Sequence, residues 1–168
     1  MVRKLLIILF ALLIPLDLFA QDISPWHAPT EDELGNHAEW RKDDPNHYLL
    51  IKADFDGDNE EDTARLVVHD KENKMGILVT LSSLAKTGPL LIAANNDKRA
   101  IQTIGIKVAK PGEYKTACGK GYYDCKKDEP EQIRFDRPGI DFFKYESANM
   151  YFLWNGDSKS FYEIYISD

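Results

Sequence analysis

The chain has 168 residues and a formal net charge of −7, with 28 acidic and 21 basic side chains. An acidic protein is repelled by phosphate backbones and anionic membranes, so nucleic acids and lipid surfaces are excluded as expected partners. The length suits one domain with its own hydrophobic core.

The first 20 residues are predicted to be a secretory signal peptide. Two basic residues, Arg3 and Lys4, lie near their start, an apolar run follows from Leu5 to Leu16, and the small residue Ala20 ends them. The alternative, a transmembrane anchor, would need about 20 apolar residues, and this run is shorter and followed by an aspartate. We therefore expect cleavage after Ala20, a periplasmic or secreted protein, no membrane span after cleavage, and one domain over 21–168.

The first element expected after the cut is a short helix over 31–41. Thr30 and Glu33 have the spacing of a capping box, in which each side chain binds the other residue's backbone N–H. Downstream segments are short, rich in β-branched and aromatic residues, and separated by turn-forming residues. These predicted strands are 48–53, 63–68, 76–81, 90–94, 100–108, 132–135, 142–145, 151–154 and 161–166.

The fold class that follows is mainly β, that is, a β-rich α+β domain. We expect an antiparallel sheet or sandwich with a short N-terminal helix. Asn155-Gly156-Asp157 lies between the last two predicted strands and is typical of a tight hairpin turn.

An acidic loop, residues 54–62, is the most informative motif in the chain. It places aspartates at loop positions 1, 3, 5 and 9, namely Asp54, Asp56, Asp58 and Asp62. This spacing can surround one hard cation with carboxylate oxygens, and calcium is the expected ion. The alternative is a solvated acidic turn, since Asp, Asn and Gly form turns without any ion.

The pattern around this loop argues against an EF-hand. Position 12 holds Arg65 instead of a bidentate glutamate, and strands are predicted on both sides instead of helices. Asn59 occupies the sixth position, where glycine is common. Asparagine tolerates the left-handed backbone conformation better than most residues, so we expect the turn to form.

The motif Asp-x-Asp-Gly-Asp-x-x-x-Asp between two strands resembles the calcium loop of integrin-type FG-GAP and VCBS repeats. The resemblance implies side-chain ligands from Asp54, Asp56, Asp58 and Asp62, and a backbone carbonyl ligand from Glu60. It covers about nine residues and two strands, so it concerns the loop and not the whole fold. The whole chain is also similar to small exported bacterial proteins with one such loop, a resemblance that implies no activity.

Two cysteines, Cys118 and Cys125, are predicted to form a disulfide that closes a small loop, because export permits oxidation. A metal or redox pair is the alternative, although such pairs usually have two intervening residues. Within this loop, Lys120, Tyr122 and Tyr123 form a possible recognition surface. The alternative is that both tyrosines pack onto the sheet.

No catalytic residue is assigned, and the sequence favours a protein that is not an enzyme. The leading hypothesis is an exported calcium-binding module that binds a protein or an envelope polymer. An inhibitor or immunity-type protein that blocks an envelope enzyme is one specific form of it. The alternatives are an exported hydrolase acting on cell-wall or carbohydrate substrates through a carboxylate pair, and a structural envelope component.

Overall fold

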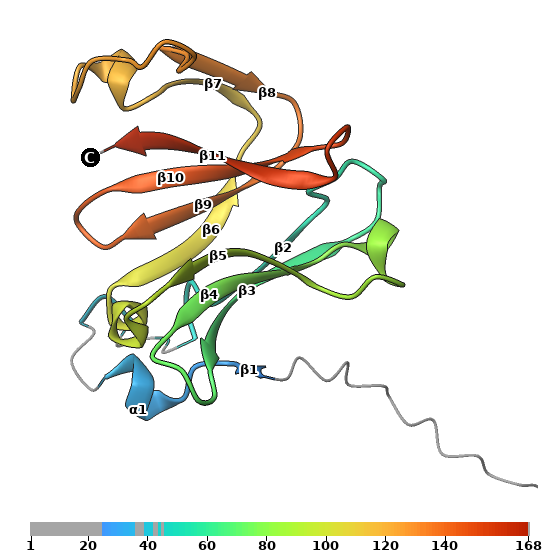
Figure 1. Cartoon of the computed structure of the whole chain (residues 1–168), viewed down its shortest axis with the longest axis vertical. Coiled ribbons are helices and arrows are strands. Elements are labelled where there is room, and N and C mark those ends of the chain that lie inside the picture. Colours follow the sequence, from blue (N-terminus) through green and yellow to red (C-terminus); the bar gives the residue numbers. More distant parts are fainter. Residues whose placement is uncertain (1–24, 36–38, 42–43, 45, 168) are drawn as a thin grey trace, which may run out of the picture.

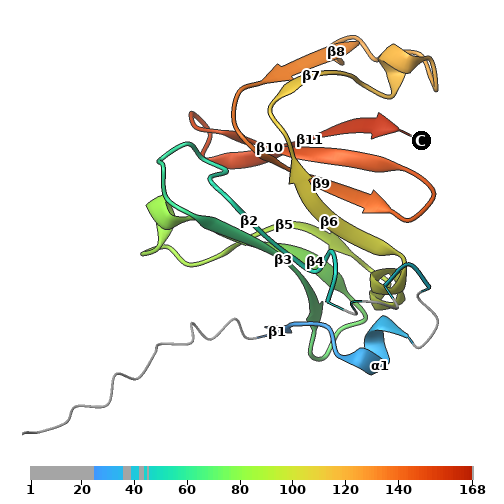
Figure 2. The same ribbon diagram turned by 180° about the vertical axis from the view of Figure 1, so that it is seen from behind.

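The computed structural model describes residues 25–35, 39–41, 44 and 46–167, and the predicted signal peptide lies outside them. Figure 1 shows three layers of antiparallel strands, with the segment that contains β1 and α1 at one end and a two-stranded hairpin at the other. Figure 2 shows the same order of layers from behind. The mainly β, antiparallel fold class expected from the sequence is therefore confirmed.

The first layer is a five-stranded sheet. Four of its strands follow the order β1–β3–β4–β5. The fifth, β2, pairs with the first half of β3, and β1 pairs with the end of β3. The strands are β1 (Trp26–His27), β2 (Leu50–Ala53), β3 (Asp62–His69), β4 (Met75–Thr80) and β5 (Leu90–Asn95).

The second layer is a four-stranded sheet in the order β11–β10–β9–β6, and the third is the β7–β8 hairpin. The second layer contains β6 (Ile104–Ala109), β9 (Gly139–Lys144), β10 (Asn149–Asn155) and β11 (Ser160–Ser167). The hairpin contains β7 (Gly112–Lys115) and β8 (Gln132–Phe135).

Two apolar clusters hold these layers together. The larger one joins the two main sheets through fully buried residues such as Leu66, Ile77 and Ile106. The smaller one joins the second sheet to the hairpin, where Tyr114 of β7 stacks on Phe135 of β8 at a centroid distance of 5.3 Å. The middle sheet therefore buries side chains on both faces, which explains why both faces of β9 and β10 carry bulky residues.

The N-terminal helix is shorter than expected. Helix α1 spans Glu31–Leu34, and the predicted capping box between Thr30 and Glu33 is present. Gly35 ends the helix with a positive φ of 72°, a value that favours glycine because other residues would be strained there. A separate 3₁₀ turn, η1 (Glu39–Arg41), follows. Among the described residues, no helix is both long and apolar enough to cross a bilayer.

Arg41 has a structural role that the sequence did not indicate. Its side chain is buried, and its guanidinium donates hydrogen bonds to the backbone carbonyls of His47, Ile101 and Ile104. Burial lowers the pKa of Arg41 to about 10, so the group stays charged at neutral pH. One guanidinium thus links the N-terminal segment to the backbone before and at the start of β6.

The predicted strand over 100–108 is partly wrong. Its first part belongs to the 3₁₀ helix η3 (Lys98–Gln102), and only β6 is extended. Asp97 starts η3 because its carboxylate accepts a hydrogen bond from the backbone N–H of Arg99. Strands β1 and β7 were not predicted, because each is short and has no apolar alternation. Two further 3₁₀ turns are η2 (Ser82–Leu84) and η4 (Cys118–Lys120).

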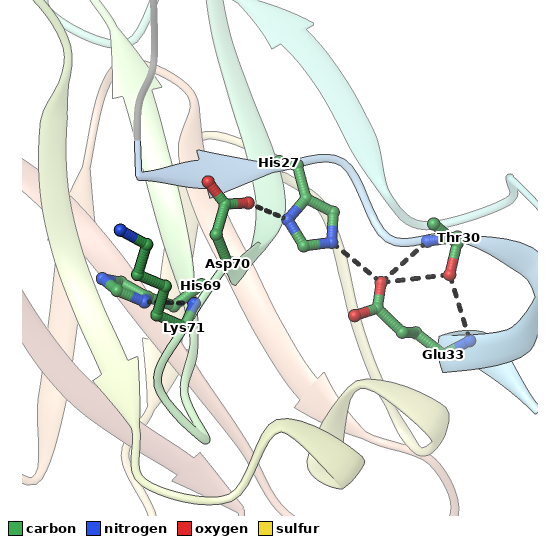
Figure 3. A network of polar contacts seen from close by, with 6 residues as sticks. All are labelled: His27, Thr30, Glu33, His69, Asp70 and Lys71. Carbon is green, nitrogen blue, oxygen red and sulfur yellow. Dashed lines mark hydrogen bonds and ion pairs between the residues drawn. The ribbon is translucent and has the colours of Figure 1, made fainter.

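A network centred on His27 fastens β1 and α1 to the turn after β3 (Figure 3). The His27 ring contacts carboxylates on both sides, with Nδ1 2.7 Å from Asp70 Oδ1 and Nε2 3.0 Å from Glu33 Oε2. Burial lowers the pKa of His27, but the hydrogen bonds with Glu33 and Asp70 outweigh it and raise this pKa above its usual 6.5. The protonated ring can donate to both carboxylates, so it joins three segments at one point.

Candidate metal centre

The acidic loop connects β2 to β3, as the sequence predicted, and lies beside η2 and the turn between β10 and β11 (Figures 1 and 2). Phe55 within the loop is fully buried in the larger apolar cluster. This side chain fixes the loop to the sandwich, while Asp54 and Asp56 on either side of it are only half-buried.

Asp54 organises the loop backbone. Its carboxylate accepts hydrogen bonds from the backbone N–H groups of Gly57, Asp58 and Asn59 at 2.6, 3.1 and 3.0 Å. Gly57 and Asn59 have φ values of 85° and 68°, so both adopt the left-handed conformation. The expectation that Asn59 can replace glycine at the sixth position is therefore confirmed.

Three of the predicted ligands converge. One carboxylate oxygen from each of Asp54, Asp56 and Asp58 lies within 4.8 Å of the other two. Glu60 follows this cluster and its backbone N–H donates to Asp58 Oδ1 at 2.8 Å. The role of the Glu60 carbonyl as a ligand stays a prediction.

Two hydroxyl groups from η2 approach the same cluster. Ser82 Oγ donates to Asp58 Oδ2 at 2.5 Å, and Ser83 Oγ donates to Asp56 Oδ2. The hydrogen bond from Ser82 is the main reason why the pKa of Asp58 lies below its usual value. These serines were missed by sequence reasoning, since they lie over 20 residues downstream and match no motif.

Asp62 lies at the base of the loop with only 1% of its surface exposed. Its two oxygens accept hydrogen bonds from the backbone N–H groups of Phe55 and Ser82, each at 2.8 Å. Burial raises the pKa of Asp62, and these two hydrogen bonds act against that rise. Asp62 therefore ties the loop to η2. It is not among the three converging carboxylates, and its role as a ligand stays a prediction.

Arg137, from the connection between β8 and β9, also supports the loop. Its Nη1 donates to the backbone carbonyl of Asp56 at 2.6 Å. A Cβ atom on Gly57 would lie 3.0 Å from the same Nη1, so a side chain there would crowd the guanidinium as well as strain the backbone. No local sequence signal pointed to this contact, which spans 81 positions.

The donor set of this cluster consists of carboxylate oxygens. Hard cations prefer such ligands, whereas softer metals favour imidazole and thiolate. The group formed by Asp54, Asp56 and Asp58 can therefore hold a metal ion, and the protein's own hydrogen bonds already fix the backbone that carries these side chains.

The predicted disulfide is present, with Cα atoms of Cys118 and Cys125 4.9 Å apart. Within its loop, Lys120 Nζ donates to the carbonyl of Ile166 at 2.6 Å, and Tyr123 Oη donates to Glu129 Oε1 at 2.5 Å. Tyr122 is 53% exposed. Of the three residues of the predicted recognition surface, two thus hold the loop in place and Tyr122 projects toward solvent.

No family model, curated protein or solved structure matches this chain. The resemblance of the acidic loop to FG-GAP and VCBS repeats rests on the sequence pattern and stays a prediction.

Proposed function

We propose that this protein is an exported, calcium-binding module that binds a partner and does not catalyse a reaction. The observation that carries the proposal is the convergence of Asp54, Asp56 and Asp58 within 4.8 Å on a loop between two strands. Three like charges at this separation repel one another, and a divalent cation would turn that repulsion into attraction.

Calcium fits this donor set better than magnesium does. Calcium accepts six to eight oxygen ligands in flexible geometry, whereas magnesium demands a near-ideal octahedron and keeps several waters. Loops of exported calcium modules bind with dissociation constants of about 10⁻⁴ to 10⁻³ M. The disulfide between Cys118 and Cys125 supports an oxidising compartment, in keeping with the predicted signal peptide.

The proposed role of the ion is structural. It would hold the acidic loop against η2 and the β10–β11 turn, so that this end of the sandwich presents one rigid surface. A rigid surface loses less conformational entropy on binding than a flexible one. We therefore propose that calcium prepares a binding surface for a protein or an envelope polymer.

Calorimetric titration of the protein with calcium and, separately, magnesium tests the ion. We expect saturable heat with calcium at submillimolar to millimolar concentrations and weaker binding of magnesium. Asp56→Ala removes one of the converging carboxylates and should abolish calcium uptake. Asp157→Ala, on the neighbouring turn, is the matched control and should leave it unchanged. No calcium heat up to 10 mM would overturn the proposal.

The binding role is tested by pull-down from envelope extract with the immobilised protein in calcium and in chelator. We expect one partner in stoichiometric amount in calcium, and its loss both in chelator and with Asp56→Ala. Turnover of cell-wall fragments by the purified protein would contradict the non-catalytic assignment.

A further inference from the structure

Two adjoining depressions lie next to the acidic loop. The larger one, about 350 Å³, lies between the segment after β8 and the β10–β11 turn. The smaller one, about 290 Å³, lies between that turn and the acidic loop. Both are lined by Trp154 and Gly156, so the two depressions adjoin at these residues, and the pair is called the cleft below. Volumes of about 300–1,000 Å³ are typical of small-molecule sites.

The larger depression is rich in hydrogen-bond donors. Arg134 and Arg137 line it together with Trp154 and Tyr162. Arg137 uses one N–H group on the acidic loop. Among the described residues, neither the Arg134 guanidinium nor the Trp154 indole N–H has a hydrogen-bond acceptor in the protein. The Tyr162 side chain is 45% exposed. Arg137 also forms an ion pair with Asp136, with Nε 3.7 Å from Oδ1, so Arg134 is the arginine of this depression that is available to a ligand.

We propose that this cleft binds a carboxylate-bearing sugar, of the hexuronate class, with its carboxylate at Arg134 and its ring against Trp154 and Tyr162. Planar guanidinium groups bind carboxylates in a bidentate manner. Aromatic side chains provide flat apolar surfaces for the C–H face of a ring. The inference rests on the proposed function in that it names the ligand class of the same module.

Charge around the larger depression favours a carboxylate over a phosphate. Asp136 and Asp157 also line it and balance the two arginines. A planar carboxylate carries a single negative charge, so it can pair with Arg134 although the depression as a whole has no large excess of positive charge. A phosphate dianion would meet the same two carboxylates and the acidic loop at greater electrostatic cost.

The smaller depression favours a sugar over a peptide carboxyl terminus. Its lining includes Ser83, Lys159 and Asp58, which offer donors and acceptors of the kind that sugar hydroxyls need. It shares Asp56 and Asp58 with the converging carboxylates of the acidic loop. We therefore expect calcium to raise the affinity for the second ring of an oligosaccharide.

The test is calorimetric titration of the protein with trigalacturonate, first in 1 mM calcium and then in EDTA. We expect saturable binding in calcium and weaker binding in EDTA. Arg134→Gln should lower the affinity about tenfold, the size expected for loss of a charge-assisted pair. Arg65→Gln, in β3 and outside the lining of both depressions, is the control and should change nothing. Trp154→Phe should lower the affinity less, because it keeps a ring.

Three ligand controls make the result decisive. Maltotriose lacks the carboxylate, triglycine carries it on a peptide, and glucose 6-phosphate replaces it with phosphate. Equal or tighter binding of any of these, or equal effects of Arg134→Gln and Arg65→Gln, would overturn the proposal. Calcium uptake without uronate binding would refute the cleft alone. Uronate binding without calcium uptake would refute the calcium site and leave the cleft.

Discussion

Carboxylates gather at two separate places in this protein, and their negative charges meet different partners at each place. Glu33 and Asp70 share the His27 ring, so the chain itself supplies the cation. Around Asp54, Asp56 and Asp58, no described salt bridge brings a cationic side chain, and the charges meet only N–H and hydroxyl donors. The first group should therefore respond to pH, and the second to divalent ions.

The two groups of carboxylates differ because the protein places a different kind of hydrogen-bond donor beside each. The His27 network joins segments that must be held together, and a protonated ring does this without any ligand. Asp62 and Phe55 attach the base of the acidic loop to the sandwich, and Asp54 orders its backbone through N–H groups. Carboxylate oxygens of Asp54, Asp56 and Asp58 still converge there. Carboxylates that no described cationic side chain neutralises are available for an ion.

Asp62→Ala gives the largest expected effect and tests whether the hydrogen bonds of Asp62 hold the loop independently of a bound ion. The substitution leaves the N–H groups of Phe55 and Ser82 without an acceptor, so we expect a loss of about 2–3 kcal/mol in the free energy of unfolding. Urea denaturation measures it, with and without calcium. Glu61→Ala, at an exposed neighbour, is the control. A loss below about 1 kcal/mol would show that Asp62 does not hold the loop.

Calcium itself should have the next largest effect. At ten times its dissociation constant it should add about 1.4 kcal/mol to the free energy of unfolding. Asp56→Asn should remove this gain, and His27→Gln should keep it in full. Thermal unfolding with stepped calcium measures both. If His27→Gln also lost the response, the two groups of carboxylates would not be independent.

The His27 network should produce a smaller, pH-dependent effect. Because the pKa of His27 is raised above 6.5 in the folded protein, its contribution is fully present below pH 6.5 and is lost as pH rises through the folded value. The ring is 36% exposed, so we expect less than about 1 kcal/mol. Comparing urea midpoints of the protein and His27→Gln between pH 5.5 and 8.5 measures it. Identical pH profiles would contradict the prediction.

Without calcium, Asp56→Asn should produce the smallest effect, and this effect should be a gain in stability instead of a loss. Removing one of three repelling charges should stabilise the calcium-free protein by about 0.3–0.5 kcal/mol. The gain should shrink in 1 M NaCl, because salt screens charges near the surface. Destabilisation in EDTA would mean that the hydrogen bond from Ser83 to Asp56 outweighs the repulsion.

Several features could be predicted because they depend on neighbours in sequence. The capping box of Thr30 and Glu33, the disulfide between Cys118 and Cys125 and most strands follow from spacing or from alternation of apolar residues. The left-handed conformation of Asn59 follows from the turn that the aspartate pattern imposes. These features depend on local backbone conformation and on side chains that lie near one another in the sequence.

The β10–β11 connection shows the limit of such reasoning. The hairpin forms as predicted, but Asn155 pairs with Ser160, so four residues lie in its loop. The Asn155 side chain accepts hydrogen bonds from the backbone N–H groups of Asp157 and Ser158. The sequence indicated a turn here, and the register of the two strands decided its length.

By itself, the sequence determined a β-rich chain with a cap, a disulfide and an acidic loop between two strands. Only the tertiary structure decided that Ser82, Ser83 and Arg137 surround that loop, and that Arg41 is buried against three carbonyls. The physical reason is that periodicity records whether a side chain faces the core or solvent. It does not record which distant backbone group will meet that side chain once the sheets have packed.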